Sequence, residues 1–133
     1  WLLPADPQLG KMVAGAASQL GHIFPVFYRF HGGKGIVCAG ALALMMDWRI
    51  FVILFSVFLI VFFTTHYVSL GSVLAAVGYA IAFPVFFRNN LPVALLGVAV
   101  ALMALFMHRS NIVRLCKGKE TKTYLKKSHR EET

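Results

Sequence analysis

Charged residues are scarce in this sequence, and acidic residues are the scarcest among them. Only 14% of the 133 residues are charged, with 13 Lys and Arg against five Asp and Glu, whereas 59% are hydrophobic. A soluble domain carries about 25% charged residues, so this composition excludes an ordinary soluble enzyme. Asp6 and Asp47 are the only acidic residues before residue 109, which excludes catalysis by paired carboxylates or by an Asp-based triad.

Metal-ligating and disulfide-forming patterns are also missing. Cys38 and Cys116 form no C-x-x-C pair, and no pair of the five histidines has the spacing of metal ligands. The sequence therefore predicts neither a metal site nor a cofactor, and it gives no basis for a structural disulfide.

Apolar segments separated by short polar turns make up most of the first 108 residues. They cover 7–24, 36–46, 50–63, 68–87 and 91–107, and we expect each to form a helix. The sequence thus predicts an all-α fold, a polytopic membrane helix bundle with about five membrane helices. Segment 36–46 would be roughly 16 Å long, too short for a hydrocarbon core of about 30 Å, and should be shielded by protein.

The first helix carries signals for its start and for close packing. Asp6 suits an N-cap and Pro7 the first helical position. Gly10, Ala14 and Ser18 then recur every four residues, a spacing that lets helix backbones approach closely in a membrane.

Positive charge is concentrated at the C-terminus. Residues 109–133 contain eight basic and three acidic residues. Because Lys and Arg accumulate on the cytoplasmic side of a membrane protein, the C-terminus is predicted to be cytoplasmic. We expect a membrane-embedded helical domain over 1–108, with a cytoplasmic loop at 25–35, and a basic cytoplasmic tail over 109–133.

A glycine-rich loop precedes the short helix. Gly32, Gly33 and Gly35 surround Lys34, so backbone N–H groups and an ammonium group could converge on a phosphate. The loop is not a Walker loop, because no Ser or Thr follows the lysine. The alternative is an ordinary turn whose lysine reaches the membrane interface.

Other polar side chains fall near the same predicted cytoplasmic side. On a continuous helix, His108 and Asn111 would be about 60° apart on one face. The alternative is a basic stop sequence at the membrane surface, which would need only Lys and Arg and not this pair. Ser69 and Ser72 are three residues apart at the start of the fourth helix, although a serine there often bonds only to its own helix. His22 ends the first helix and could be an ordinary core histidine.

Three stretches resemble those of the membrane acyl-phosphate:glycerol-3-phosphate acyltransferases of bacteria. They are GHIFPVFYRFHGGKG at 21–35, YVSLGS at 67–72 and HRSNIVRLCKGKE at 108–120. The resemblance implies a multi-pass enzyme of the bacterial inner membrane. Such an enzyme would transfer a fatty acyl group from acyl phosphate to the 1-hydroxyl of glycerol 3-phosphate, giving lysophosphatidic acid and phosphate.

The resemblance also implies roles for particular residues. Lys34, His108 and Asn111 would be catalytic, and the other matched positions would bind substrate: Gly32, Gly33, Gly35, Ser72 and His22. The implied partners are glycerol 3-phosphate, fatty acyl phosphate and membrane lipid, with no nucleic acid. The alternative is a non-enzymatic membrane protein, such as a transporter subunit or a scaffold with a lipid-binding basic tail.

Members of the family have seven membrane helices and a first cytoplasmic loop with a Ser-Gly-Asn-x-Gly-x-Thr-Asn motif. This sequence lacks the motif and begins with Trp1. We therefore expect it to lack the first two helices and to have little or no activity alone.

Overall fold

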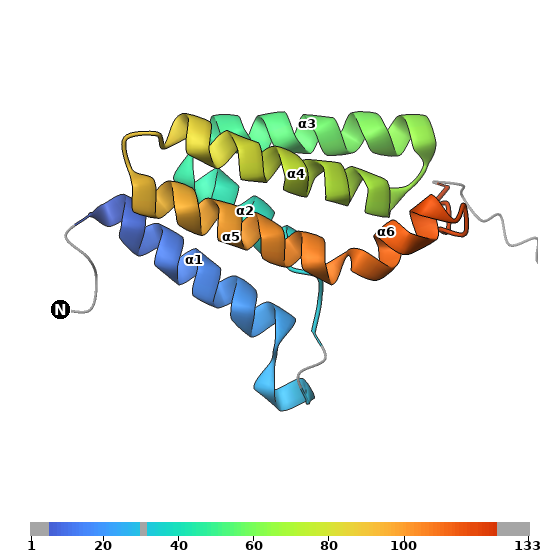
Figure 1. The fold of residues 1–133 in the computed structure, drawn as a ribbon, viewed down its shortest axis with the longest axis horizontal. Helices are drawn as coiled ribbons and strands as arrows, with labels where there is room; N and C mark the ends of the chain where they lie inside the picture. The colour runs from blue at the N-terminus through green and yellow to red at the C-terminus, as the bar shows by residue number, and fades with distance from the viewer. Residues whose placement is uncertain (1–5, 30–31, 125–133) are drawn as a thin grey trace, which may run out of the picture.

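The computed structural model describes residues 6–29 and 32–124, and this part of the chain is helical with no strand (Figure 1). The loop residues 30–31 and the tail residues 125–133, on which some predictions fall, lie outside the described residues. The elements are α1 (Pro7–Ile23), the 3-10 helix η1 (Val26–Tyr28), α2 (Ile36–Met46), α3 (Trp48–Thr65), α4 (Val68–Phe86), α5 (Leu91–Met107) and α6 (Arg109–Cys116). The predicted all-α fold is confirmed.

Short polar side chains start the helices where the sequence predicts. The Asp6 carboxylate accepts from the Gln8 N–H at 2.8 Å, with Pro7 as the first residue of α1. The Asn90 side chain caps α5 and also donates to the Asp6 carboxylate. The two capping residues thereby join the N-terminal ends of α1 and α5.

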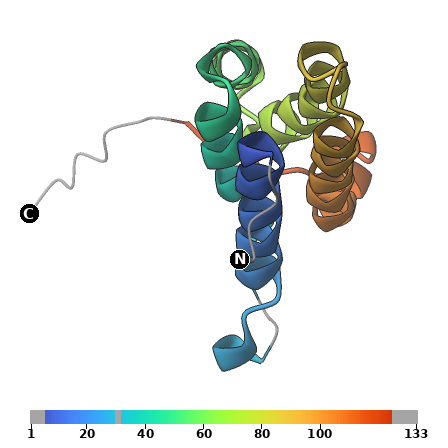
Figure 2. The same ribbon diagram turned by 90° about the vertical axis from the view of Figure 1, so that its left-hand side faces the viewer.

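The helices pack around one apolar core. α4 is antiparallel to α3 and α5, whereas α1 runs parallel to α5. α4 packs against both α3 and α5, while α1 packs against α2 and α5. Figure 2 shows α1 below α3 and α4, where it packs between α2 and α5. The core includes Met12, Leu42, Ile50 and Phe83, each at most 2% exposed.

The helix lengths bear on membrane crossing. α3 and α4 are long and apolar enough to span a bilayer, and α5 with α6 would make a third, bent span. α2 is shorter and apolar, as predicted. The expectation of five membrane helices stays a prediction, although all five predicted segments form helices.

Two local expectations differ from the structure. Residues 47–49, between the predicted segments 36–46 and 50–63, were expected to form a short polar turn. Trp48 and Arg49 instead begin α3, because the Asp47 carboxylate accepts from the Arg49 N–H at 2.9 Å and caps the helix. The chain also bends by 57° between α5 and α6. His108 and Asn111 therefore do not share one continuous helix face.

Candidate functional site

A chain of polar side chains joins the glycine–lysine loop to α6. The Lys34 ammonium donates to Asn111 Oδ1 at 2.6 Å, and the Asn111 amide donates to Glu120 Oε1 at 2.7 Å. Arg114 donates from Nε to the other Glu120 oxygen at 2.6 Å. Asn111 is 4% exposed, whereas Lys34 is exposed. The fold thus brings Lys34 and Asn111, separated by 77 positions in sequence, into direct contact.

Residues 117–124, which we call the strap, fold back over the α3–α4 turn and carry Glu120. The Thr123 N–H donates to the His66 carbonyl at 2.8 Å, and the Tyr124 ring lies 5.0 Å from the His66 ring. Lys122 Nζ lies 5.4 Å from the centre of the Tyr67 ring. These contacts hold the strap beside the polar cluster.

The Glu120 carboxylate is stabilised in its charged form. Burial raises the pKa of this carboxylate. Hydrogen bonds from Arg114 and Asn111, together with the Ser69 hydroxyl, lower the pKa by more than burial raises it, to about 2. Ser69 Oγ is near enough to have this effect, yet it makes no well-formed hydrogen bond within the described chain. Glu120 is therefore ionised at neutral pH and fixes the orientation of the Asn111 amide.

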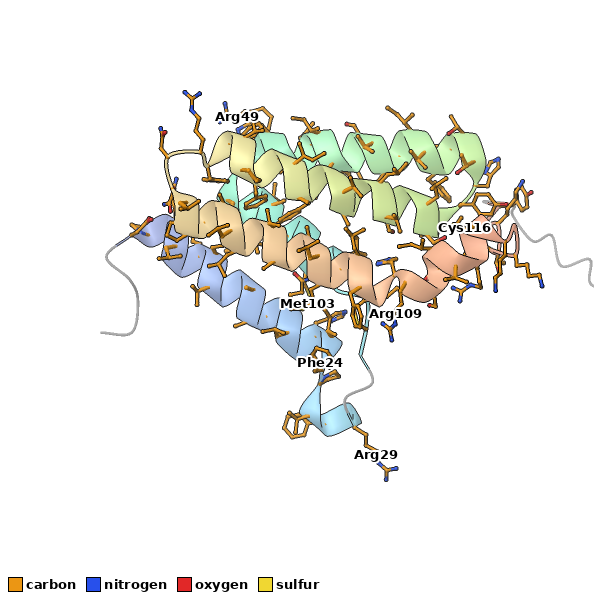
Figure 3. All side chains as sticks on the ribbon, in the orientation of Figure 1. Phe24, Arg29, Arg49, Met103, Arg109 and Cys116 are labelled. Carbon is orange, nitrogen blue, oxygen red and sulfur yellow. The ribbon has the colours of Figure 1, made fainter. Side chains whose placement is uncertain are left out.

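His108 lies at the bend between α5 and α6 and is 2% exposed. Its Nδ1 is 2.8 Å from the Ala104 carbonyl oxygen. Because that oxygen can only accept, Nδ1 carries the proton in the neutral ring, and Nε2 is left with a lone pair. Arg109, labelled in Figure 3, directs its guanidinium to the Phe106 carbonyl and the outer surface of the bend.

The glycine loop lies directly on the end of α1. The Gly33 N–H donates to the His22 carbonyl at 3.2 Å, and a side chain at Gly33 would collide with the His22 ring. A side chain at Gly32 would collide with the His22 carbonyl oxygen. Gly35 has φ +75°, a conformation that favours glycine. No side chain within the described residues caps α2 at Gly35, so the first N–H groups of α2 can reach an anion.

An apolar groove of about 520 Å³ lies between α2, α3, α4 and α5. Its lining includes Ile36, two residues after Lys34, and Ala104, whose carbonyl oxygen contacts the His108 ring. Ile36, Ser72 and Ala104 line the groove near the polar cluster, whereas Ala43 and Tyr79 line its far part. From Ser72 to Tyr79 the groove follows α4 for about 10 Å, at roughly 1.5 Å per residue. Its walls are almost entirely hydrocarbon, as an acyl chain requires.

The structure shows which of the predicted site residues lie together. Lys34 contacts Asn111, His22 contacts the glycine loop, and Ser72 lines the groove. His108 packs against α5 near this cluster. Within the described part of the chain, no hydrogen bond joins His108 to Lys34.

Sequence reasoning missed two contributors, Glu120 and Arg114. Both stand in the stretch 108–120, but their separation of six residues is not a helical ion-pair spacing, so no signal in the sequence indicated their contact.

The fold and the site together define an all-helical membrane protein with a cationic, glycine-lined cluster close to an apolar groove. The family model described as glycerol-3-phosphate acyltransferase matches residues 2–118. The chain belongs to this family.

Curated relatives and solved structures agree with this assignment. A glycerol-3-phosphate acyltransferase of Finegoldia magna is 42% identical over 114 residues, which are 86% of this chain and 58% of the relative. One of Geobacillus kaustophilus is 41% identical over 84% of this chain and 56% of the relative. The crystal structure of PlsY, an integral membrane glycerol 3-phosphate acyltransferase in its glycerol 3-phosphate form, matches with a TM-score of 0.76 and 32% identity, over 85% of this chain and 56% of that one. The chain thus spans somewhat more than half the length of these proteins.

Proposed function

We propose that this chain provides the acyl-transfer site of a glycerol-3-phosphate acyltransferase that uses acyl phosphate as the donor. The observation that carries the proposal is the contact between Lys34 and Asn111 close to an apolar groove, whose lining begins with Ile36 two residues after Lys34. A phosphate needs the cationic end, and a fatty acyl chain needs the groove. The names of the relatives and of the PlsY forms, which bind glycerol 3-phosphate or lysophosphatidic acid, support the same chemistry.

Lys34 and the loop of Gly32, Gly33 and Gly35 bind phosphate in this proposal. Lys34 is exposed and has only a neutral amide oxygen as its hydrogen-bond acceptor in the described chain, so its positive charge is not cancelled by direct pairing. The N–H groups at the start of α2 add the positive end of a helix dipole, worth about 0.3–1 kcal/mol to an anion. His22 supports the loop from below.

His108 and Asn111 act on the reacting groups. The 1-hydroxyl oxygen of glycerol 3-phosphate forms a bond to the acyl carbonyl carbon, the bond from that carbon to the phosphate oxygen breaks, and phosphate leaves with the electron pair. His108 Nε2, which holds a lone pair, accepts the hydroxyl proton. Lys34 and Asn111 stabilise the negative charge that develops, and no covalent enzyme intermediate is required.

The acyl chain lies in the groove, with Ser72 at the end nearest the polar cluster. Burial of each methylene there contributes about 0.8 kcal/mol. The cluster faces the cytoplasm of a bacterial inner membrane. The basic residues of α6 and the strap support this orientation. They lie at the end of the bundle where Figure 3 labels Cys116, and Arg49 is labelled at the opposite end. The division into a membrane domain over 1–108 and a cytoplasmic tail over 109–133 belongs to the same proposal.

The experiment measures lysophosphatidic acid formed from labelled glycerol 3-phosphate in membrane vesicles. Because the chain spans 58% of the Finegoldia magna relative, vesicles are made with the chain alone and with a hybrid in which that relative supplies its unmatched sequence. Acyl phosphate should support product formation by the hybrid, and acyl-CoA should not replace it.

Lys34→Ala should abolish this activity, while Lys11→Ala, which removes an exposed lysine on α1, should leave it unchanged. A hybrid that inserts into membranes and makes no product from acyl phosphate would refute the proposal. It would favour the non-enzymatic transporter subunit or scaffold.

A further inference from the structure

Gln19 is the one described polar side chain buried in α1, with 1% exposure. Its Nε2 donates to the Val100 carbonyl of α5 at 3.1 Å, whereas its Oε1 has no hydrogen-bond partner within the described chain. An unpaired buried acceptor costs free energy, about 1–3 kcal/mol. A leucine of similar size would avoid that cost, so packing alone does not account for a glutamine here.

Gln19 also contacts the end of the phosphate loop. A Cβ atom at Gly35 would lie 3.0 Å from both Gln19 Cγ and Gln19 Nε2. The amide that bonds to α5 therefore supports the glycine that immediately follows Lys34. Gly35 is buried and has a positive φ, so the side chains that pack against it, Gln19 and Ile23, set its position.

Through this contact, Gln19 joins the loop that carries Lys34 to the helix that leads to His108 and Asn111. α2, which follows Lys34, packs chiefly on α1 and α3, while α5, which leads to His108 and Asn111, packs on α4 and α1. α2 and α5 also touch each other, and α1 packs on both of them. At one end of α1 the capping residue Asp6 bonds to Asn90, and toward the other end Gln19 bonds to Val100. Figure 1 shows α1 diverging from α5 toward that second end, where a tie between the helices matters most.

We infer that Gln19 is a positioning residue, which sets the location of Lys34 relative to Asn111 by linking Gly35 to α5. The inference rests on the proposed function, because it assigns Gln19 an effect on acyl transfer. Gln19 acts through the loop and does not need to touch either substrate.

The test compares Gln19→Leu with wild type in the hybrid, with Ser18→Ala as the control that removes an exposed hydroxyl from the neighbouring position. The Val100 carbonyl keeps its own helical hydrogen bond, so Gln19→Leu should be as stable to heat as wild type, or more stable. A displaced lysine should nevertheless lower kcat/KM by about tenfold or more, since small misplacements of a reacting group are costly. A rise in KM for glycerol 3-phosphate should accompany the fall. Full wild-type kinetics in a stable Gln19→Leu protein would overturn the inference, and so would a loss of stability with unchanged kinetics.

A second readout does not depend on turnover. Spin labels are placed on cysteines at Val37 and Val113, which are exposed on α2 and α6, after Cys38 and Cys116 are replaced by Ser. The distance distribution between the labels should be narrow with Gln19 and broader or displaced with Gln19→Leu. An unchanged distribution would overturn the positioning role even if wild type is active. Conversely, a hybrid without acyltransferase activity whose distribution responds to Gln19→Leu would refute the proposed function and leave the link between the helices standing.

Discussion

Asn111 connects the cationic loop to the strap, and its replacement gives the most informative prediction. Its carbonyl oxygen accepts from Lys34 and its amide donates to Glu120. Asn111→Ala removes both hydrogen bonds. The first costs little stability because Lys34 is exposed and water replaces the lost acceptor. The second costs more, because the Glu120 side chain is only 8% exposed. A hydrogen bond to a charged group contributes about 1.5–3 kcal/mol, and we expect a destabilisation in that range.

The effect on activity should be much larger than the effect on stability. Removal of one preorganised donor or positioning group at such a site costs about 10²–10³ in rate. Thermal unfolding in detergent gives the stability change, and lysophosphatidic acid formation by the hybrid gives the rate. Asn89→Ala, in the exposed turn before α5, is the control and should change neither.

Asn111→Asp separates the two roles of the amide. This variant retains an acceptor for Lys34 but places a second carboxylate 2.7 Å from Glu120, where the amide nitrogen had been. Repulsion should make Asn111→Asp unstable at neutral pH, with recovery in acid as one carboxylate is protonated. Wild-type stability and wild-type turnover in Asn111→Ala would refute the reasoning about this cluster.

Three further predictions address the strap, the loop and the topology. The pKa of Glu120 is lowered from 4.5 to about 2, so its contribution to strap docking is present above pH 4.5 and is lost as the pH falls toward 2. The protection of strap amides from hydrogen exchange, measured relative to the intrinsic exchange rate at each pH, should fall over that window, and protection that is insensitive to acid would contradict this. Gly33→Ala should raise KM for glycerol 3-phosphate, because the new methyl group displaces the His22 ring; steady-state kinetics test this, and an unchanged KM would show that the contact is unimportant. A cysteine at Asn89 should react with an impermeant reagent outside intact cells, and one at Ser128 only after the cells are opened; the reverse pattern would invert the proposed orientation.

Local signals were sufficient to predict the helices. Asp6 and Pro7 mark the start of α1, and the apolar runs give α2, α3, α4 and α5 within a few residues, because capping and hydropathy act over short distances. The short helices η1 and α6 were not predicted. The bend at His108 could not be predicted in this way. No proline or glycine marks it, and it accompanies the packing of α6 against α4.

The site could be predicted only in part. Lys34 and Asn111 were recognisable from their sequence surroundings, but their contact depends on how α1, α2 and α5 pack. Glu120 follows a glycine with φ +62° at position 118 and folds back onto α6. Gln19 lies in an apolar helix, and its link to Val100 joins residues 81 positions apart. Such long-range contacts leave no periodic signal in a single sequence.

The central claim, that Lys34 binds the phosphate of a substrate, can be tested most directly by solid-state NMR. The hybrid is labelled with 15N at lysine side chains and loaded with glycerol 3-phosphate in a phosphorus-free glycolipid, and dipolar dephasing of the lysine 15Nζ signal by the substrate 31P is measured. We expect one strongly dephased lysine signal, which disappears in Lys34→Ala and persists in Lys11→Ala. Substrate binding without lysine dephasing, or dephasing that survives Lys34→Ala, would contradict the claim.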